Sequence, residues 1–299
     1  MHVNLFEVAM GAIASLAVPF AAMGVAGKPV DTPLLPLTET LEIAATVIDY
    51  PLPGEFLVEA RPATAPSIRL ETPAFRVMKR QVSLADYDLC VADGACRPAD
   101  ARPTSADVPV TGVNWLDAEA YASWYSRGTG ANWRLPTALE AAVAAGERFG
   151  GETFTAQADD PANPAIRWLR RYREEAAAKR SPDPEPKPFG HYGPNSMGIE
   201  DFGGNVWEWT STCYERVTLA SDGKTVLSTT ENCGVHVLEG RHRAYMSNFV
   251  RDGKSGGCAV GTPPENLGFR LVRDDTGFPS VAWLDARLRG LVRQPLSKF

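Results

Sequence analysis

Residues 195–210 carry the strongest structural signal in this chain and read Asn-Ser-Met-Gly-Ile-Glu-Asp-Phe-Gly-Gly-Asn-Val-Trp-Glu-Trp-Thr. Asn205 and Glu208 stand three residues apart around an expected turn. Their side-chain oxygens, together with backbone carbonyls, are the ligands that Ca²⁺ prefers. The alternative is a purely structural turn, in which Glu208 accepts backbone N–H bonds and the two Trp side chains fill the core.

Two further segments flank this one along the chain. Residues 109–124 read Pro-Val-Thr-Gly-Val-Asn-Trp-Leu-Asp-Ala-Glu-Ala-Tyr-Ala-Ser-Trp, and residues 133–137 follow with Trp-Arg-Leu-Pro-Thr. Near the other end, residues 266–273 read Asn-Leu-Gly-Phe-Arg-Leu-Val-Arg. We expect Arg134 and Arg270 to be buried anchors with structural roles.

In this order, the three segments resemble the formylglycine-generating enzyme family, also called the sulfatase-modifying factor domain. The resemblance covers roughly residues 50–275, and Gly-Asn-Val-Trp-Glu-Trp is its most specific part. It implies an α+β fold of the C-type-lectin-like kind, with little regular secondary structure. Because family members use this turn as a calcium site, it also implies that Asn205, Val206 and Glu208 hold calcium.

Local signals predict where elements begin and end. Alternating apolar residues predict short strands at 55–59, 68–70 and 75–78, and Leu41 to Ile48 fits either a helix or a strand. Helices are expected after the caps Ser83 and Thr137, along 117–125, and over 165–179. The expected organisation is an export segment over 1–27, a Pro-rich linker over 28–48, the domain over 49–275, and a tail helix over 276–299.

Composition excludes several classes of protein. The chain has 299 residues, of which 44% are hydrophobic and 22% are charged, so it is neither a disordered tail nor a polytopic membrane protein. Its net charge is −6. A nucleic-acid-binding protein usually carries a basic surplus, so no nucleic-acid partner is expected.

The amino terminus predicts export. Residues 8–27 carry no charge, and twenty helical residues span about 30 Å, roughly one hydrocarbon core. Gly24 and Ala26 suit a signal-peptidase site, although no Lys or Arg precedes the run and Glu7 lies beside it. The alternative is an amphipathic or buried helix. We expect a periplasmic protein, or one anchored through residues 8–27 and facing the periplasm.

The five cysteines also point to an oxidising compartment, where disulfides persist. Cys90 and Cys96 bracket a short loop that a disulfide could close, while Cys213, Cys233 and Cys258 lie in the second half. Because five is odd, one thiol is left over in any intrachain pairing. We take Cys90, Cys96, Cys213 and Cys233 as the disulfide candidates, with a bridge from Cys258 to Cys213 or Cys233 as the alternative.

The chain departs from the family at its reaction centre. The oxygen-dependent enzymes of the family hold copper with two cysteines upstream of Gly-Phe-Arg, but the matching residues 243–252 contain no cysteine. Cys258 lies nearby, and a mixed His and Cys site suits a soft transition metal. Calcium is the expected metal, and copper or iron is left open.

A stretch rich in polar residues remains as a candidate reaction centre. We select Cys258, His242, Tyr245 and Ser247 as catalytic candidates, because His suits proton transfer near neutral pH. His236 lies in the same stretch, and the alternative is that both histidines are simply hydrogen-bonded. The resemblance implies an exported maturation factor, an oxidoreductase if it is an enzyme, that acts on a protein or peptide partner. The alternative is a non-catalytic accessory protein that holds a partner.

Overall fold

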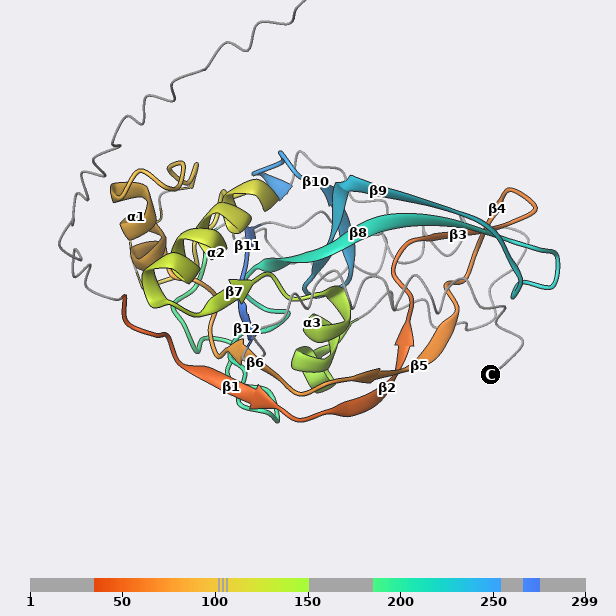
Figure 1. Cartoon of the computed structure of the whole chain (residues 1–299), viewed down its shortest axis with the longest axis horizontal. Coiled ribbons are helices and arrows are strands. Elements are labelled where there is room, and N and C mark those ends of the chain that lie inside the picture. Colours follow the sequence, from red (N-terminus) through yellow and green to blue (C-terminus); the bar gives the residue numbers. More distant parts are fainter. Residues whose placement is uncertain are drawn as a thin grey trace, which may run out of the picture. The chain divides into compact units, whose positions relative to one another are not determined.

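The computed structural model describes residues 35–101, 103, 105, 107–150, 185–253 and 266–274 (Figure 1). Four expectations lie outside these residues: the export segment, the helix over 165–179, the tail helix and the surroundings of Cys258. No helix among the described residues is long and apolar enough to cross a membrane.

The centre of the fold is a six-stranded mixed sheet built on the long β8–β9 pair. The strand order is β10-β9-β8-β3-β4, and β11 pairs with β8 in parallel. Figure 1 shows β8 and β9 running from the region of α2 to β3 and β4. The strands are β3 (Glu55–Val58), β4 (Arg61–Ala63), β8 (Trp207–Leu219), β9 (Val226–Glu239), β10 (Ala244–Ser247) and β11 (Leu267–Gly268).

Two smaller sheets complete the β structure. One has the order β1-β6-β12-β7, and the other pairs β2 with β5. The first strand begins inside the range 28–48 that the sequence assigned to a linker, so the folded domain starts earlier than expected. The strands are β1 (Thr40–Ile43), β2 (Thr46–Pro51), β5 (Ser67–Thr72), β6 (Phe75–Met78), β7 (Asn132–Arg134) and β12 (Val272–Asp274).

Two of the described helices, α1 and α3, begin at the caps that the sequence predicted. The Ser83 side chain accepts from the Asp86 N–H at the start of α1, and Thr137 and Glu140 form a capping box on α3. A second capping box, formed by Asn114 and Asp117, starts α2. The elements are α1 (Leu84–Ala92), α2 (Trp115–Thr129), α3 (Ala138–Ala145) and the 3₁₀ turn η1 (Gly146–Arg148). The predicted α+β fold with little regular secondary structure is confirmed.

One buried ion pair joins two of the three family segments, 195–210 and 266–273. Arg270, which follows β11, donates from Nε to Glu208 Oε2 at 2.5 Å and from Nη2 to Glu208 Oε1 at 2.6 Å. Each residue is only 1% exposed. The remaining Arg270 N–H groups reach the carbonyl oxygens of Met78, Lys79 and Glu200. The structural role expected for Arg270 is therefore confirmed.

Breaking this pair should destabilise the whole domain. Arg270→Met would leave the Glu208 carboxylate buried without its countercharge, which typically costs about 3–5 kcal/mol. We expect urea unfolding to show a loss of that size. The double variant Arg270→Met, Glu208→Leu should lose less than the sum of the two single variants. Additive losses would contradict a direct interaction.

Candidate functional site

The predicted calcium turn is closed by contacts within the protein. Asn205 Oδ1 accepts from the Lys187 N–H at 2.9 Å, and Asn205 Nδ2 donates to the Lys187 carbonyl at 2.7 Å. Val206 is buried, and both carboxylate oxygens of Glu208 are held by Arg270. A calcium ion bound through Asn205 and Glu208 would have to replace these donors.

The contacts of Asn205 and Glu208 favour the structural turn over the calcium site that the sequence predicted, and melting experiments decide between the two. Because Arg270 occupies the Glu208 carboxylate, we expect the same melting temperature in calcium and in a chelator. A higher melting temperature in calcium, lost in Asn205→Ala, would contradict this and support the calcium site.

The segment that holds copper in the family has structural contacts here. Arg243 is fully buried and donates to Glu239 at 2.8 Å, to the Pro51 carbonyl at 2.9 Å and to the Tyr50 hydroxyl at 3.1 Å. Burial disfavours the charge of Arg243, but Glu239, Tyr50 and Tyr245 together outweigh this effect, so the pKa of Arg243 is raised. Since residues 243–252 also lack cysteine, this segment does not fit a paired-thiolate copper site.

The catalytic candidates have varied surroundings. His242 is buried, its Nδ1 donates to the Arg243 carbonyl at 2.9 Å, and its ring meets Trp207 edge to face. The Tyr245 hydroxyl accepts from the Gly54 N–H at 2.7 Å. Tyr245 and Ser247 lie on one face of β10, two residues apart. Cys258 lies outside the described residues, so their joint role as a site stays a prediction.

Two disulfides form between the four candidate cysteines. Cys90 pairs with Cys96 beside α1, and Cys213 of β8 pairs with Cys233 of β9. The alternative that bridged Cys258 to Cys213 or Cys233 is therefore wrong. The first disulfide is buried, whereas Cys213 is half-buried and Cys233 is exposed.

A break in strand register creates the second disulfide. Cys213 is opposite His236, but Tyr214 is opposite Asn232, so the pairing skips residues 233–235 of β9. This bulge brings Cys233 back over Cys213, with a Cα–Cα distance of 4.6 Å. The same bulge leaves His236 directly beside the disulfide.

The His236 ring has a stacking partner and a contact at each of its two nitrogens. Its ring stacks on Trp115 with the ring centroids 4.1 Å apart and an interplanar angle of 14°. Nδ1 lies 2.6 Å from Asn248 Oδ1, and Nε2 lies 3.8 Å from Cys213 Sγ. The Trp115 indole is fixed in turn by its hydrogen bond to the Thr210 carbonyl at 3.0 Å.

The neighbours of His236 determine which ring nitrogen carries the proton. Asn248 Nδ2 donates to the Cys233 carbonyl at 2.8 Å, and a carbonyl oxygen can only accept. Asn248 Oδ1 must therefore face His236, and Nδ1 of the neutral ring is its donor. Nε2 then presents its lone pair to Cys213 Sγ.

Burial favours this neutral ring. Removal from water lowers the pKa of His236, and the hydrogen bond with Asn248 acts in the opposite direction. Only 3% of the residue is exposed. The ring is thus a base enclosed by protein, next to a disulfide that reaches the surface.

The sequence analysis selected three members of this cluster but did not predict that they lie together. Cys213, Cys233 and His236 were each selected, but Trp115 and Asn248 were not. Their contact depends on the β8–β9 bulge, which the alternation of apolar residues does not reveal. One sequence signal could have indicated the bulge. Gly234, in the Cys-Gly-Val-His run at 233–236, interrupts a strand, and an isolated Gly within a strand often indicates a bulge.

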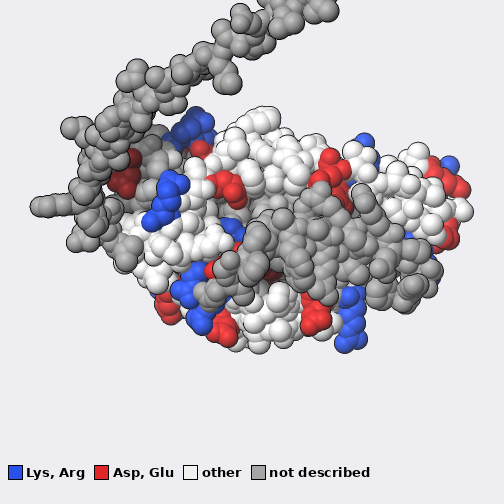
Figure 2. All heavy atoms as spheres, in the orientation of Figure 1, with Lys and Arg blue, Asp and Glu red and all other residues white. Residues whose placement is uncertain are grey.

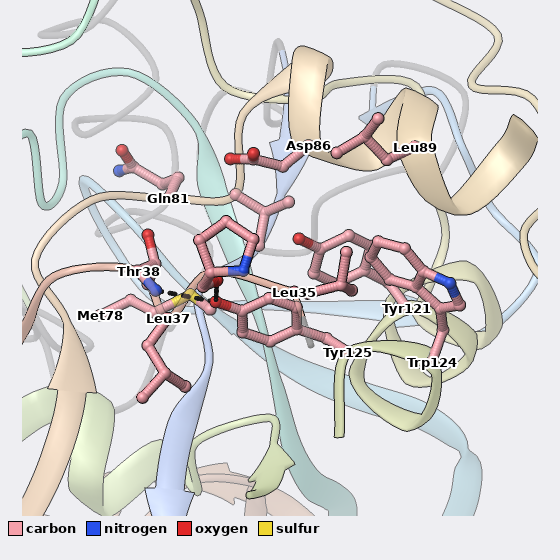
Figure 3. A pocket seen from close by; sticks show the side chains of 12 residues that line it. Leu35, Leu37, Thr38, Met78, Gln81, Asp86, Leu89, Tyr121, Trp124 and Tyr125 are labelled. Carbon is pink, nitrogen blue, oxygen red and sulfur yellow. Dashed lines mark hydrogen bonds between the residues drawn. The ribbon is translucent and has the colours of Figure 1, made fainter. Parts of the chain in front are cut away.

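A cavity of about 190 Å³ lies elsewhere, between the segment 35–38 and the helices α1 and α2 (Figure 3). The Tyr125 hydroxyl, which donates to the Pro36 carbonyl and accepts from the Thr38 N–H, holds this segment in place. Among the residues that the structure describes, no predicted catalytic, metal or disulfide residue lines it. The lining includes Leu35, Leu37, Met78, Tyr121, Trp124 and Tyr125.

The burial of His236 predicts a pH dependence of stability. The folded protein holds the pKa of His236 below its ordinary value of about 6.5, so the unfolded chain binds more protons in acid. This contribution to stability is present above pH 6.5 and is lost as the pH falls toward the folded pKa. From about pH 8 to about pH 5, the melting temperature of the native protein should therefore fall more than that of His236→Gln. His191→Gln, at an exposed histidine, is the matched control. Parallel curves for the native protein and His236→Gln would contradict the prediction.

The sequence is similar to those of known proteins. The family model for the sulfatase-modifying factor enzyme 1-like domain matches residues 40–275. A formylglycine-generating enzyme from Mycobacterium tuberculosis is 31% identical over 187 residues, which are 56% of this chain and 57% of that protein. The inactive C-alpha-formylglycine-generating enzyme 2 of Mus musculus is 29% identical over 176 residues, 58% of this chain and 52% of that protein. The chain thus spans just over half the length of these curated relatives.

A solved structure, PvdO from Pseudomonas aeruginosa, matches with a TM-score of 0.48 and 18% identity, over 79% of this chain and 94% of that chain. The family model covers the whole described domain from its first strand to its last, and includes all three segments identified above. The chain therefore belongs to the formylglycine-generating enzyme, or sulfatase-modifying factor, family.

Proposed function

We propose that this protein is an exported maturation factor that acts on a protein or peptide-derived substrate without a copper–thiolate centre. The observation that carries the proposal is the placement of its cysteines. Two described pairs are disulfides, and the segment that would hold copper contains none. Disulfides of this kind persist in oxidising compartments, which supports export.

The surface supports a protein or peptide partner better than a polyanion. On the face drawn in Figure 2, described Lys and Arg side chains are interspersed with Asp and Glu. The net charge of −6 acts in the same direction, because a nucleic-acid partner would be repelled.

A non-catalytic accessory role is the second candidate. His242 and Tyr245 both have structural partners within the described residues, namely Trp207 and Gly54. The relatives include proteins named as inactive formylglycine-generating enzymes. An accessory protein would bind its partner without changing it chemically.

Fractionation and metal loading test the proposal. The native chain should be recovered from the periplasm or the cell envelope. The purified protein, offered Cu(I), should bind less than one ion per chain under conditions that load a formylglycine-generating enzyme with its cysteine pair. Recovery from the cytosol would refute export, and stoichiometric copper lost on Cys258→Ala would refute a copper-free site. Mass analysis of a captured partner separates the two roles, because only a maturation factor leaves it covalently changed.

A further inference from the structure

We propose that Cys213, Cys233, His236 and Asn248 form a thiol–disulfide exchange site, whose substrate is a thiol-bearing protein or peptide. The inference deepens the proposed maturation role by naming a substrate class and a reaction. It stands on the geometry of the β8–β9 bulge.

The two sulfurs of the disulfide have different surroundings. Cys233 is exposed, while Cys213 is half-buried and faces the ring of His236. An incoming thiolate therefore reaches Cys233 Sγ, and Cys213 Sγ is the leaving group. The leaving sulfur departs beside Nε2, the ring nitrogen that has a free lone pair when Asn248 fixes Nδ1 as the donor.

The exchange step balances within this site. The incoming thiol RSH loses its proton and forms an S–S bond with Cys233, while the bond between Cys233 and Cys213 breaks. The electron pair of that bond stays on Cys213 as a thiolate, and the proton ends on Nε2 of His236. A second thiol of the same substrate then attacks the mixed disulfide, which oxidises the substrate to a disulfide and leaves Cys233 reduced. Exchange with a small-molecule or protein disulfide restores the starting state.

After reduction, the arrangement becomes a Cys–His–Asn set. The Cys213 thiol can donate its proton to Nε2, and Asn248 stabilises the resulting imidazolium through Nδ1. Asn248 is a positioning residue: its own N–H donates to the Gly234 carbonyl at 3.0 Å, and its amide donates to the Cys233 carbonyl. The bulge that carries Cys233 is therefore tied to the group that orients the base.

Other described residues around Cys213 and His236 also affect the charge of this site. Trp115 stacks on the ring from α2, and Met246 is paired with His236 across β9 and β10, so neither adds charge. The exposed Glu231 carboxylate lies within 4.8 Å of both sulfurs. It opposes formation of the Cys213 thiolate, so Glu231→Gln should make that thiolate form at lower pH.

Two exposed apolar side chains lie next to the cluster in sequence. Leu116, beside Trp115, is 55% exposed, and Phe249, beside Asn248, is 74% exposed. Arg251 joins their two segments through its 2.7 Å ion pair with Asp117. Such side chains suit contact with a protein or peptide better than with a small polar thiol.

The first experiment treats the full-length native protein with reduced glutathione and maps the products by peptide mass spectrometry. We expect glutathione on Cys233 and a free Cys213, with the buried Cys90–Cys96 disulfide intact as the internal control. Glutathione on Cys213, or equal reaction at both disulfides, would overturn the proposal. The experiment needs no variant, so misfolding cannot obscure it.

The second experiment follows the Cys213 thiolate by its ultraviolet absorbance in Cys233→Ser, Cys258→Ser. We expect it to titrate between about pH 3.5 and 7.5 instead of near the ordinary 8.5. Adding His236→Gln should return the midpoint to about 8.5 or above, and Asn248→Ala should give an intermediate shift. The control Cys213→Ser, Cys258→Ser reports Cys233 alone. A Cys213 midpoint at or above 8.5 that does not respond to His236→Gln would overturn the proposal. These measurements use purified protein, so failed fractionation would refute export and leave them interpretable.

Discussion

The guanidinium of Arg270 and the carboxylate of Glu208 make up the contact on which the rest of the domain depends. It joins the first residues of β8 to the segment after β11, and through three carbonyl oxygens to the chain after β6 and around Glu200. A pair buried to this degree is stable only when nearly every donor and acceptor is used. That requirement fixes the start of β8, and β8 in turn carries the sheet.

Two further buried arginines stabilise other parts of the domain in the same way. Arg243 binds Glu239 and the carbonyl of Pro51, and Arg134 binds Glu140 and Asp274. Arg243 and Arg134 therefore hold strands and loops together, and the structural role expected for Arg134 is confirmed. The group that we propose to be reactive lies in β9 three residues before Glu239, where His236 contacts the disulfide between Cys213 and Cys233.

Much of the fold could be predicted from the sequence, because its signals are local. Ser83 and Thr137 cap helices through contacts only three residues away, and Cys90 and Cys96 close a short loop. The site could be predicted less well. The partner of Glu208 is 62 residues distant, and the pairing of Cys213 with Cys233 depends on a bulge. Such contacts are set by strand register, which a pattern of apolar residues defines only in regular strands.

The most direct test of this account is a peptide map of the native protein, isolated from the cell envelope with its thiols blocked and without reduction. We place the reactive sulfur of this protein in the β8–β9 pair, on the scaffold of the family. We therefore expect linked peptides for Cys213 with Cys233 and for Cys90 with Cys96, and a blocked peptide for Cys258. A linkage of Cys258 to Cys213 or Cys233 would contradict this placement, because His236 would then face a different bond.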